Sequence, residues 1–294
     1  MQAPTAAPGK SSFGDVAEDI GDSIQAGGRA ASPGIEMLGR FGYAAKGAVY
    51  ILIGTLAVQA AMGEGGQTTD QTGALARVAE MPFGKALLGL LVVGLLGYAL
   101  WRIVQAVMDT EHKGTDAKGI FARSMYVGIG LLYVGTALSA LQLMLGNSGG
   151  AGSSEKTQGW TAMLMAQPFG VWLVGLAGVA VFANGIAQLF KAWKSSFTED
   201  LHLTDVGAQH ADLVTKIGRA GYSARGVAFM MIGGFLVGAA MHNNPNEAQG
   251  LDGILATLAA QPFGPYLLGA VALGLAAYGV FALVEARYRR MVID

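Results

Sequence analysis

The chain contains no cysteine, and only 13% of its residues are charged. Without cysteine, disulfide bonds and thiolate metal sites are excluded. The charged share is about half of the ~25% found in ordinary globular proteins. Residues 1–35 also lack the apolar segment of a cleavable signal peptide, so we expect the first apolar run to direct membrane insertion. The low share of charged residues argues against a water-soluble domain.

Apolar residues make up 52% of the chain and gather in long runs. A helix needs about 20 such residues to cross the ~30 Å hydrocarbon layer of a bilayer. Six runs are close to that length: Ala44–Met62, Lys85–Val107, Arg123–Leu145, Phe169–Phe190, Ser223–Met241 and Pro265–Val284. We therefore predict an all-α membrane protein with six transmembrane helices, surrounded by the lipid bilayer.

Residues that carry chemistry are scarce inside these runs. An ionisable side chain at the bilayer centre costs at least about 2.5 kcal/mol and persists mainly for function. The middle thirds of the runs have none, and charged residues nearer the ends are expected to extend to the interface: Lys46, Lys85, Arg102, Arg123, Arg225 and Glu285. No nucleophile, metal-ligand set or cofactor loop is visible. We expect no enzyme activity, no cofactor, no metal and no nucleic-acid partner.

One motif occurs three times. It reads LGRFGYAAKGAVY at 38–50, IGRAGYSARGVAF at 217–229 and, in a divergent form, FARSMYVGIGLLY at 121–133. Each copy has an arginine, a tyrosine three residues later and a glycine seven residues later, a spacing that places all three on one helix face. The positions are Arg40, Tyr43 and Gly47; Arg123, Tyr126 and Gly130; and Arg219, Tyr222 and Gly226. The middle copy departs from the others at Ser124, Met125, Val127 and Ile129.

A second motif, Pro-Phe-Gly, opens the other three apolar runs at Pro82, Pro168 and Pro262. A short apolar segment precedes each copy and is too short to span, so we expect interfacial helices there. These segments are Ala74–Met81, Trp160–Ala166 and Leu251–Ala260. The alternation predicts three tandem two-helix repeats, related by pseudo-threefold symmetry about the membrane normal.

The predicted organisation has four parts. Residues 1–35 form a disordered cytoplasmic tail with a short acidic amphipathic helix from Phe13, and Pro33 lies in the first turn of the next helix. The repeats then cover residues 36–112, 113–195 and 196–294. With six spans, 16 of the 19 lysines and arginines fall on the side of both termini. This bias predicts that both termini are cytoplasmic.

The three repeated arginines, Arg40, Arg123 and Arg219, have three alternative roles. Facing the pseudo-threefold axis, they would bind an anion or a lipid headgroup. Facing outward, they would anchor the protein beside Tyr43, Tyr126 and Tyr222 in an interfacial belt. Alternatively, they cap the cytoplasmic ends of neighbouring helices. Asn184 and Gln188, one turn apart, either line a cavity or form hydrogen bonds between helices.

The repeated G-R-x-G-Y-x-x-[KR]-G at Gly39 and Gly218, its divergent partner at Arg123, and the three Pro-Phe-Gly motifs identify a resemblance. The chain resembles the bacterial membrane-protein family built from three copies of domain of unknown function 1206, over residues 36–288. The resemblance implies six helices in a bacterial cytoplasmic membrane, and it carries over no catalytic residues.

Two functional hypotheses follow. The first is a non-enzymatic structural or interaction protein with an unidentified partner on its cytoplasmic face. The alternative is a passive channel or facilitator for a small neutral or anionic solute along the pseudo-threefold axis. A continuous polar cavity on the axis favours the channel, and an axis closed by glycine packing favours the first hypothesis.

Overall fold

A computed structural model describes residues 13–111, 113–147, 152–199, 201 and 208–289. Six helices in this part are long and apolar enough to cross a membrane, which confirms the predicted number of spans. They are α1 (Phe13–Met62), α3 (Gly84–Met108), α4 (Ala117–Met144), α6 (Gly170–Lys194), α8 (Ala208–Met241) and α10 (Gly264–Tyr288). The described chain has no β-sheet, only an isolated bridge between Leu201 and Arg289.

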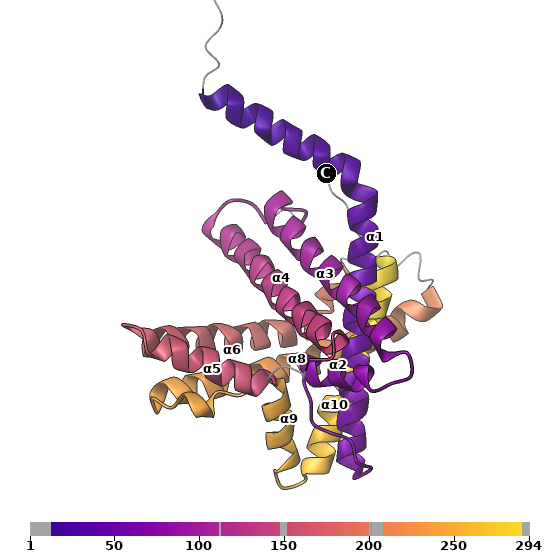
Figure 1. Ribbon diagram of the computed structural model, residues 1–294, viewed down its shortest axis with the longest axis vertical. Coiled ribbons are helices and arrows are strands. Elements are labelled where there is room, and N and C mark those ends of the chain that lie inside the picture. Colours follow the sequence, from indigo (N-terminus) through magenta and orange to yellow (C-terminus); the bar gives the residue numbers. More distant parts are fainter. Residues whose placement is uncertain (1–12, 112, 148–151, 200, 202–207, 290–294) are drawn as a thin grey trace, which may run out of the picture.

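Helix α1 differs from its prediction. The spacing from Phe13 indicates a separate short helix in a tail, but the structure has one helix from Phe13 to Met62 that continues through Pro33. Only its Glu36–Met62 part is apolar enough to span. Figure 1 shows the preceding part projecting away from the other helices. Residues 1–12 lie outside the described part.

The Pro-Phe-Gly motifs form three equivalent turns. Each joins a short helix to a span: α2 (Gln71–Ala79) to α3, α5 (Ser153–Met165) to α6, and α9 (Leu251–Ala259) to α10, so the three predicted short helices are present. Phe83, Phe169 and Phe263 each have φ of 61° and cap the following span. The glycine is required by close approach, since a Cβ on Gly84 would lie 2.4 Å from the carbonyl oxygen of Val78.

The spans pack most extensively across repeat boundaries. The main pairs are α1 with α10, α3 with α4, and α6 with α8, each joining the second span of one repeat to the first span of another. Within the first and third repeats, α1 packs on α3 and α8 packs on α10. The middle repeat is different, because α4 and α6 form no extensive contact in the described chain. Figure 1 shows these two helices diverging, so the ring of six spans is open on one side.

The repeated glycines explain the three pairs. A Cβ on Gly47 would lie 2.7 Å from the carbonyl oxygen of Gly279, and one on Gly226 would lie 2.9 Å from that of Gly185. In the middle copy, a Cβ on Gly130 would lie 3.1 Å from the carbonyl oxygen of Ala99. Small residues let helix backbones approach this closely in lipid. The motif glycine therefore lies where helices of neighbouring repeats cross.

The open side has a cause in the sequence. Gly42 lies against the backbone of Tyr98, where a Cβ would come within 2.4 Å of the amide nitrogen, and Gly221 lies similarly against Tyr278. The equivalent position in the middle copy is Met125. Because a methionine side chain prevents this close approach, α4 lacks the surface that α1 and α8 present to the second span of their own repeats.

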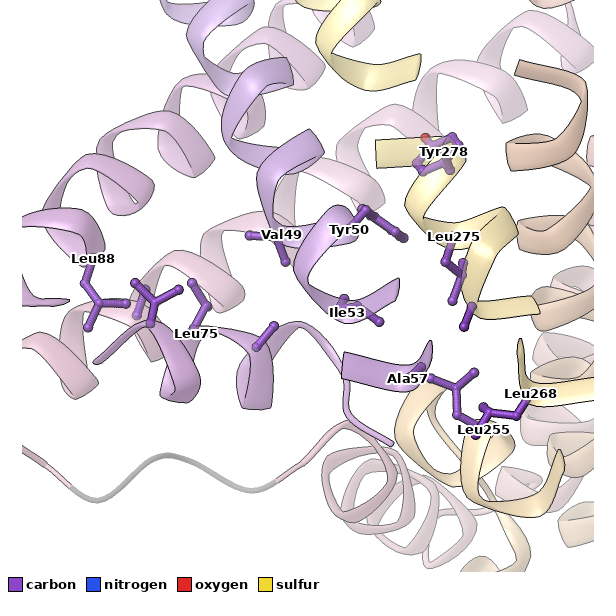
Figure 2. Packing of buried hydrophobic residues seen from close by; sticks show 14 residues of the cluster. Val49, Tyr50, Ile53, Ala57, Leu75, Leu88, Leu255, Leu268, Leu275 and Tyr278 are labelled. Atoms are coloured by element: carbon purple, nitrogen blue, oxygen red, sulfur yellow. The ribbon is translucent and has the colours of Figure 1, made fainter. Parts of the chain in front are cut away.

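The core lies along α1 and is apolar on the side of the short helices. Figure 2 shows Tyr50 and Ile53 of α1 on the side of Leu275 of α10, and Val49 on the side of Leu75 of α2. Large apolar side chains elsewhere on the spans are exposed, as lipid contact requires. Trp172 and Trp193 are 80% and 77% exposed near the two ends of α6. They are separated by about 31 Å along the helix, a spacing that suits the two interfacial aromatic belts.

The ends that carry the repeated arginines meet. We call them the basic ends. Glu111, after α3, is 3.1 Å from Arg289, after α10. Arg289 forms a bridge with Leu201, and the ring of Phe197 after α6 contacts Phe281 of α10. The ends of α3, α6 and α10 therefore gather on one side of the molecule.

Candidate functional site

A polar cluster is buried among the spans at the basic ends. Helices α1, α3, α8 and α10 and the segments after α3 and α10 contribute to it. We call it the inner cluster, and its members are Lys46, Tyr98, Arg102, Gln105, Glu111, Arg225, Tyr278, Glu285 and Arg289. Buried ionisable groups in a membrane protein are functional candidates by default, because each is costly to keep.

Lys46 is the central cation of the inner cluster. Its side chain is only 2% exposed, although it belongs to a membrane-spanning helix. Its Nζ donates to the hydroxyls of Tyr278 at 3.1 Å and Tyr98 at 3.4 Å. It also lies 3.8 Å from Glu285 and 4.7 Å from the ring centre of Tyr43. The ammonium is therefore held by phenols, an aromatic face and one carboxylate.

Arg225 occupies the equivalent position in the third repeat, six residues after the motif arginine. Its Nη1 donates to the hydroxyl of Tyr278 at 2.5 Å. The guanidinium also lies over the rings of Tyr278 and Phe229, at 4.7 and 5.1 Å. Tyr278 thus accepts hydrogen bonds from two cations on different helices. The Nε of Arg225 is buried and has no partner in the described chain.

The carboxylates lie toward the end of α10. Glu285 accepts a hydrogen bond from Nη1 of Arg289 at 2.5 Å, and its other oxygen is the one that faces Lys46. Glu111 accepts from Arg289 at 3.1 Å and from Tyr126 at 2.5 Å. Burial alone would raise the pKa of Glu111. Arg289 and the Tyr126 hydroxyl outweigh that effect and hold its pKa below the ordinary value.

The cations of the inner cluster outnumber its carboxylates. Lys46, Arg102, Arg225 and Arg289 formally carry four positive charges, against two negative charges on Glu111 and Glu285. Arg102 donates to Tyr98 at 2.7 and 2.9 Å and to Gln105 at 2.9 Å. Neither Arg102 nor Arg225 forms an ion pair with a carboxylate of the described residues. Within the residues that the structure describes, the cluster is therefore short of negative charge.

This burial corrects a sequence-based expectation. Side chains near span ends were expected to reach the interface, and Lys85 is indeed exposed. Lys46 and Glu285 are instead buried among the helices, and Arg102 and Arg225 point to buried tyrosines. The prediction was wrong for these four because distance from a helix end does not say which face a residue occupies. These four side chains lie on inward helix faces, where polar groups of neighbouring helices contact them.

Two of the three repeated arginines cap neighbouring helices. Arg40 donates to the carbonyls of Ala286 at 3.2 Å and Arg287 at 2.5 Å, at the end of α10. Arg123 donates to Ala106 at 2.6 Å and Val107 at 3.0 Å, at the end of α3. These bonds satisfy terminal carbonyls and place positive charge at the negative end of the helix dipole.

Arg219 does not follow this pattern. It is exposed and shows no capping bond in the described chain. The third copy of the motif therefore keeps its arginine without the contact that its two relatives make.

The repeated tyrosines face the interior rather than an interfacial belt. Tyr43 is fully buried, and its ring packs edge-on against Tyr98 at 5.0 Å between centres. Tyr126 donates to Glu111, and Tyr222 stacks on Phe197 at 5.0 Å. The belt alternative is therefore wrong for these tyrosines.

Asn184 and Gln188 show no side-chain hydrogen bond between helices in the described chain, and their cavity-lining alternative stays a prediction. Gln188 is 6% exposed and its Oε1 has no hydrogen-bond partner, and Asn184 is half-buried. Asn184 lies fourteen residues after the Pro-Phe-Gly glycine, the position of Tyr98 and Tyr278 in the other repeats. The middle repeat thus lacks the tyrosine as well as the packing of α4 on α6.

Sequence reasoning missed the pairing of these tyrosines with Lys46 and Arg225. The signal was a basic residue six positions after the motif arginine, matched in the first and third repeats by a tyrosine fourteen positions after the Pro-Phe-Gly glycine. The middle repeat has Ile129 and Asn184 at those positions. The two features change together, which is expected if they are in contact.

Two hollows in the described chain lie away from the inner cluster. A small one is lined by Gln67, Thr69 and Arg77, beside the loop before α2. An open and mainly apolar groove of about 460 Å³ runs along α3 and α4 beside Arg123. Neither is lined by Lys46, Arg225 or Tyr278.

Comparison with known proteins gives one family. A family model described as Domain of Unknown Function (DUF1206) matches residues 41–109, 124–195 and 220–289. The chain is also similar to "Uncharacterized protein YxxB" from Bacillus subtilis (strain 168), with 38% identity over 259 residues, 88% of this chain and 93% of the relative. No solved structure matches the chain. The three matched segments confirm the three tandem repeats that the motifs predict.

Proposed function

The chain belongs to the DUF1206 family of multi-pass membrane proteins, and from that premise we propose that it is non-enzymatic and works by holding a ligand or a protein partner. The observation that carries this proposal is the closed packing at the inner cluster. Tyr43, Lys46, Tyr98 and Tyr278 are each no more than 2% exposed. Backbone contacts at Gly47 and Gly226 close the adjoining helix crossings. Packing of this kind supports a cluster that no solute crosses, although the ring of spans is open between α4 and α6.

The proposal includes a location. We place the protein in a bacterial cytoplasmic membrane with both termini in the cytoplasm, because 16 of its 19 lysines and arginines are on that side. The basic ends then face the cytoplasm, where a protein partner would bind. Arg219 suits such a contact, since it is exposed and caps no helix end in the described chain.

A solute-flux measurement tests the closed axis. The full chain is reconstituted in liposomes, and uptake of glycerol, chloride and inorganic phosphate is compared with protein-free liposomes. We expect no uptake above the protein-free rate. Uptake that rises with the amount of protein would contradict the proposal.

The second candidate is a passive facilitator for a small anion, favoured by the excess positive charge of the inner cluster. It predicts uptake of chloride or phosphate that is lost in Arg225→Gln. Substitution of Arg77, an exposed arginine outside the cluster, would leave that uptake unchanged. The same measurement therefore separates the two candidates.

Partner binding is tested by affinity capture from bacterial membranes with wild-type protein and Arg219→Gln. We expect a cytoplasmic partner to be captured by the wild type and depleted by the variant. Arg219 is more suitable than Arg40 or Arg123 for this purpose, because changing those two also removes helix caps. Equal capture by both proteins would exclude Arg219 from the contact.

A further inference from the structure

We propose that the inner cluster binds an anionic oxygen group, of the phosphate class, at Arg225, with the buried Lys46 as a second positive charge close by. The binding site goes beyond the proposed function, which names no ligand. It rests on the arrangement of two cations around one phenol and on the shortage of carboxylates around them.

The two cations are close together. Arg225 Nη1 is 2.5 Å and Lys46 Nζ is 3.1 Å from the same hydroxyl oxygen of Tyr278. The two nitrogens are therefore separated by less than the sum of those distances. Like charges repel at this range, and a neutral phenol oxygen offsets only part of the repulsion. An anion near both cations would replace that repulsion with attraction.

The donors of Arg225 are largely unused. A guanidinium has five N–H donors in a planar fork that matches phosphate and carboxylate oxygens. In the described chain, only Nη1 has a hydrogen-bond partner, and Nε is buried with none. Buried donors without partners are costly, and a charged acceptor compensates them more strongly than a neutral one. The unpartnered donor belongs to a motif position that is also basic, as Lys46, in the first repeat.

The carboxylates of the cluster are already engaged. Glu285 accepts from Arg289 and faces Lys46, and Glu111 accepts from Arg289, Gln105 and Tyr126. Neither reaches Arg225 within 4.0 Å. The counter-charge of Arg225 must therefore come from outside the described protein residues, or the site remains unbalanced.

The depth of the site suits a phosphate. Lys46 and Arg225 are each the third residue of an apolar run, Ala44–Met62 and Ser223–Met241. They therefore lie about 3 to 5 Å along the helix from the basic ends of these two runs. Arg225 also stays partly accessible, whereas Lys46 does not. A lipid headgroup at those ends and a free phosphate both present the required oxygens near Arg225.

Binding is measured on the full chain in nanodiscs. Inorganic phosphate is titrated by calorimetry into phosphatidylcholine discs. In a second arm, native mass spectrometry measures retention of phosphatidylglycerol from mixed discs. Binding of phosphate alone identifies a soluble anion, and retention of phosphatidylglycerol alone identifies a lipid headgroup. Either result, lost in Arg225→Gln, supports the site. If the wild type binds neither ligand, the proposal is wrong.

Substitutions assign the binding to the cluster. We expect Arg225→Gln to weaken binding at least about tenfold, as loss of charge-assisted hydrogen bonds implies. Arg77→Gln removes an equal charge from an exposed pair with Glu80 and should bind as the wild type does. Equal binding by Arg225→Gln and the wild type would overturn the proposal.

A stability measurement separates binding from a structural role. Without ligand, Arg225→Gln should unfold at the same temperature as the wild type or higher, because it removes a partly buried charge that no carboxylate of the described chain balances. Added ligand should raise the unfolding temperature of the wild type and not of the variant. If the variant does not fold, Tyr278→Phe keeps the ring and removes the shared oxygen. Because that oxygen accepts from both cations and competes with the anion for their donors, this protein should bind the ligand at least as tightly as the wild type, and weaker binding would contradict the site.

Discussion

At the scale of single residues, the electrostatic surroundings of a charged side chain depend on which residues of other helices contact it. Lys46 and Arg225 arise from the same motif position, yet Lys46 has Glu285 at 3.8 Å and Arg225 has no carboxylate in the described chain. The difference comes from the neighbouring second span, because α10 places Glu285 beside α1 and the equivalent position of α6, which packs on α8, is Lys191. Two residues that look interchangeable in sequence therefore have different electrostatic surroundings.

Glu285→Gln tests the buried ion pairs. The change leaves Lys46 and Arg289 without their shared carboxylate, and breaking a buried pair from one side typically costs about 3 to 5 kcal/mol. We expect a large drop in the free energy of unfolding, measured in detergent micelles by denaturant titration. Glu80→Gln, in an exposed pair with Arg77, should cost less than about 1 kcal/mol. Equal effects in the two variants would show that the inner pairs contribute little.

Glu111 predicts how stability depends on pH. Its folded pKa is held below the ordinary value, so the unfolded state binds a proton more readily. The carboxylate therefore stabilises the fold at pH values above its unfolded pKa, about 4.3, and this contribution is lost as pH falls through the lower folded pKa. Unfolding temperatures measured between neutral and acidic pH should fall less steeply in Glu111→Gln than in the wild type. Parallel curves would contradict the assignment.

At the scale of helices, glycine position determines which spans pack together. The motif glycine lies at every crossing between repeats, and the glycine two residues after the arginine lies at the crossings within the first and third repeats. In the middle repeat, the residue two positions after the motif arginine is Met125, and the described chain has no extensive contact between α4 and α6. Helix packing in lipid depends on how closely backbones approach, since apolar side chains are no better off against each other than against lipid.

Gly47→Ala tests a crossing against a matched control. A Cβ on Gly47 would lie 2.7 Å from the carbonyl oxygen of Gly279, so α1 and α10 must separate. We expect a loss of about 1 to 3 kcal/mol in unfolding free energy. Gly135 on α4 has no atom within 4 Å of an added Cβ, and Gly135→Ala should be neutral or up to about 1 kcal/mol stabilising. Similar losses in both variants would mean that the crossing does not depend on close approach.

At the scale of the whole molecule, three similar repeats build an incomplete ring. The pairs α1–α10, α3–α4 and α6–α8 are equivalent by motif, and only the contact between α4 and α6 is absent from the helix packing of the described chain. Leu132 of α4, two helical turns after Met125, is exposed. The inner cluster lies among α1, α3, α8 and α10, and the middle repeat contributes little to it.

Engineered disulfides test this arrangement. The chain has no cysteine, so introduced pairs are read without background. Cβ atoms at Gly269 and Ala61 would lie 3.8 Å apart, within the range of about 3.5 to 4.5 Å for disulfides. Cysteines there should join α1 to α10 on mild oxidation, as shown by mass spectrometry. Cysteines at Met125 and Asn184, the positions that would meet in a closed ring, should stay reduced. Their efficient oxidation would show that the ring closes.

The sequence alone determined the six spans, the three repeats and the positions of the short helices and turns. These features follow from run length, periodicity and local backbone chemistry, which act over a few neighbouring residues. The motif arginines, tyrosines and glycines were also visible, because repetition displays them without any knowledge of contacts.

Only the tertiary structure decided where these residues point. The capping roles of Arg40 and Arg123, the inward burial of Lys46, and the two cations at Tyr278 depend on residues far away in the chain. The distance from a helix end limits how deep in the membrane a side chain lies. The neighbouring helix decides whether that side chain contacts a polar partner or lipid. That neighbour is set by backbone approach at glycines, which no local pattern reveals.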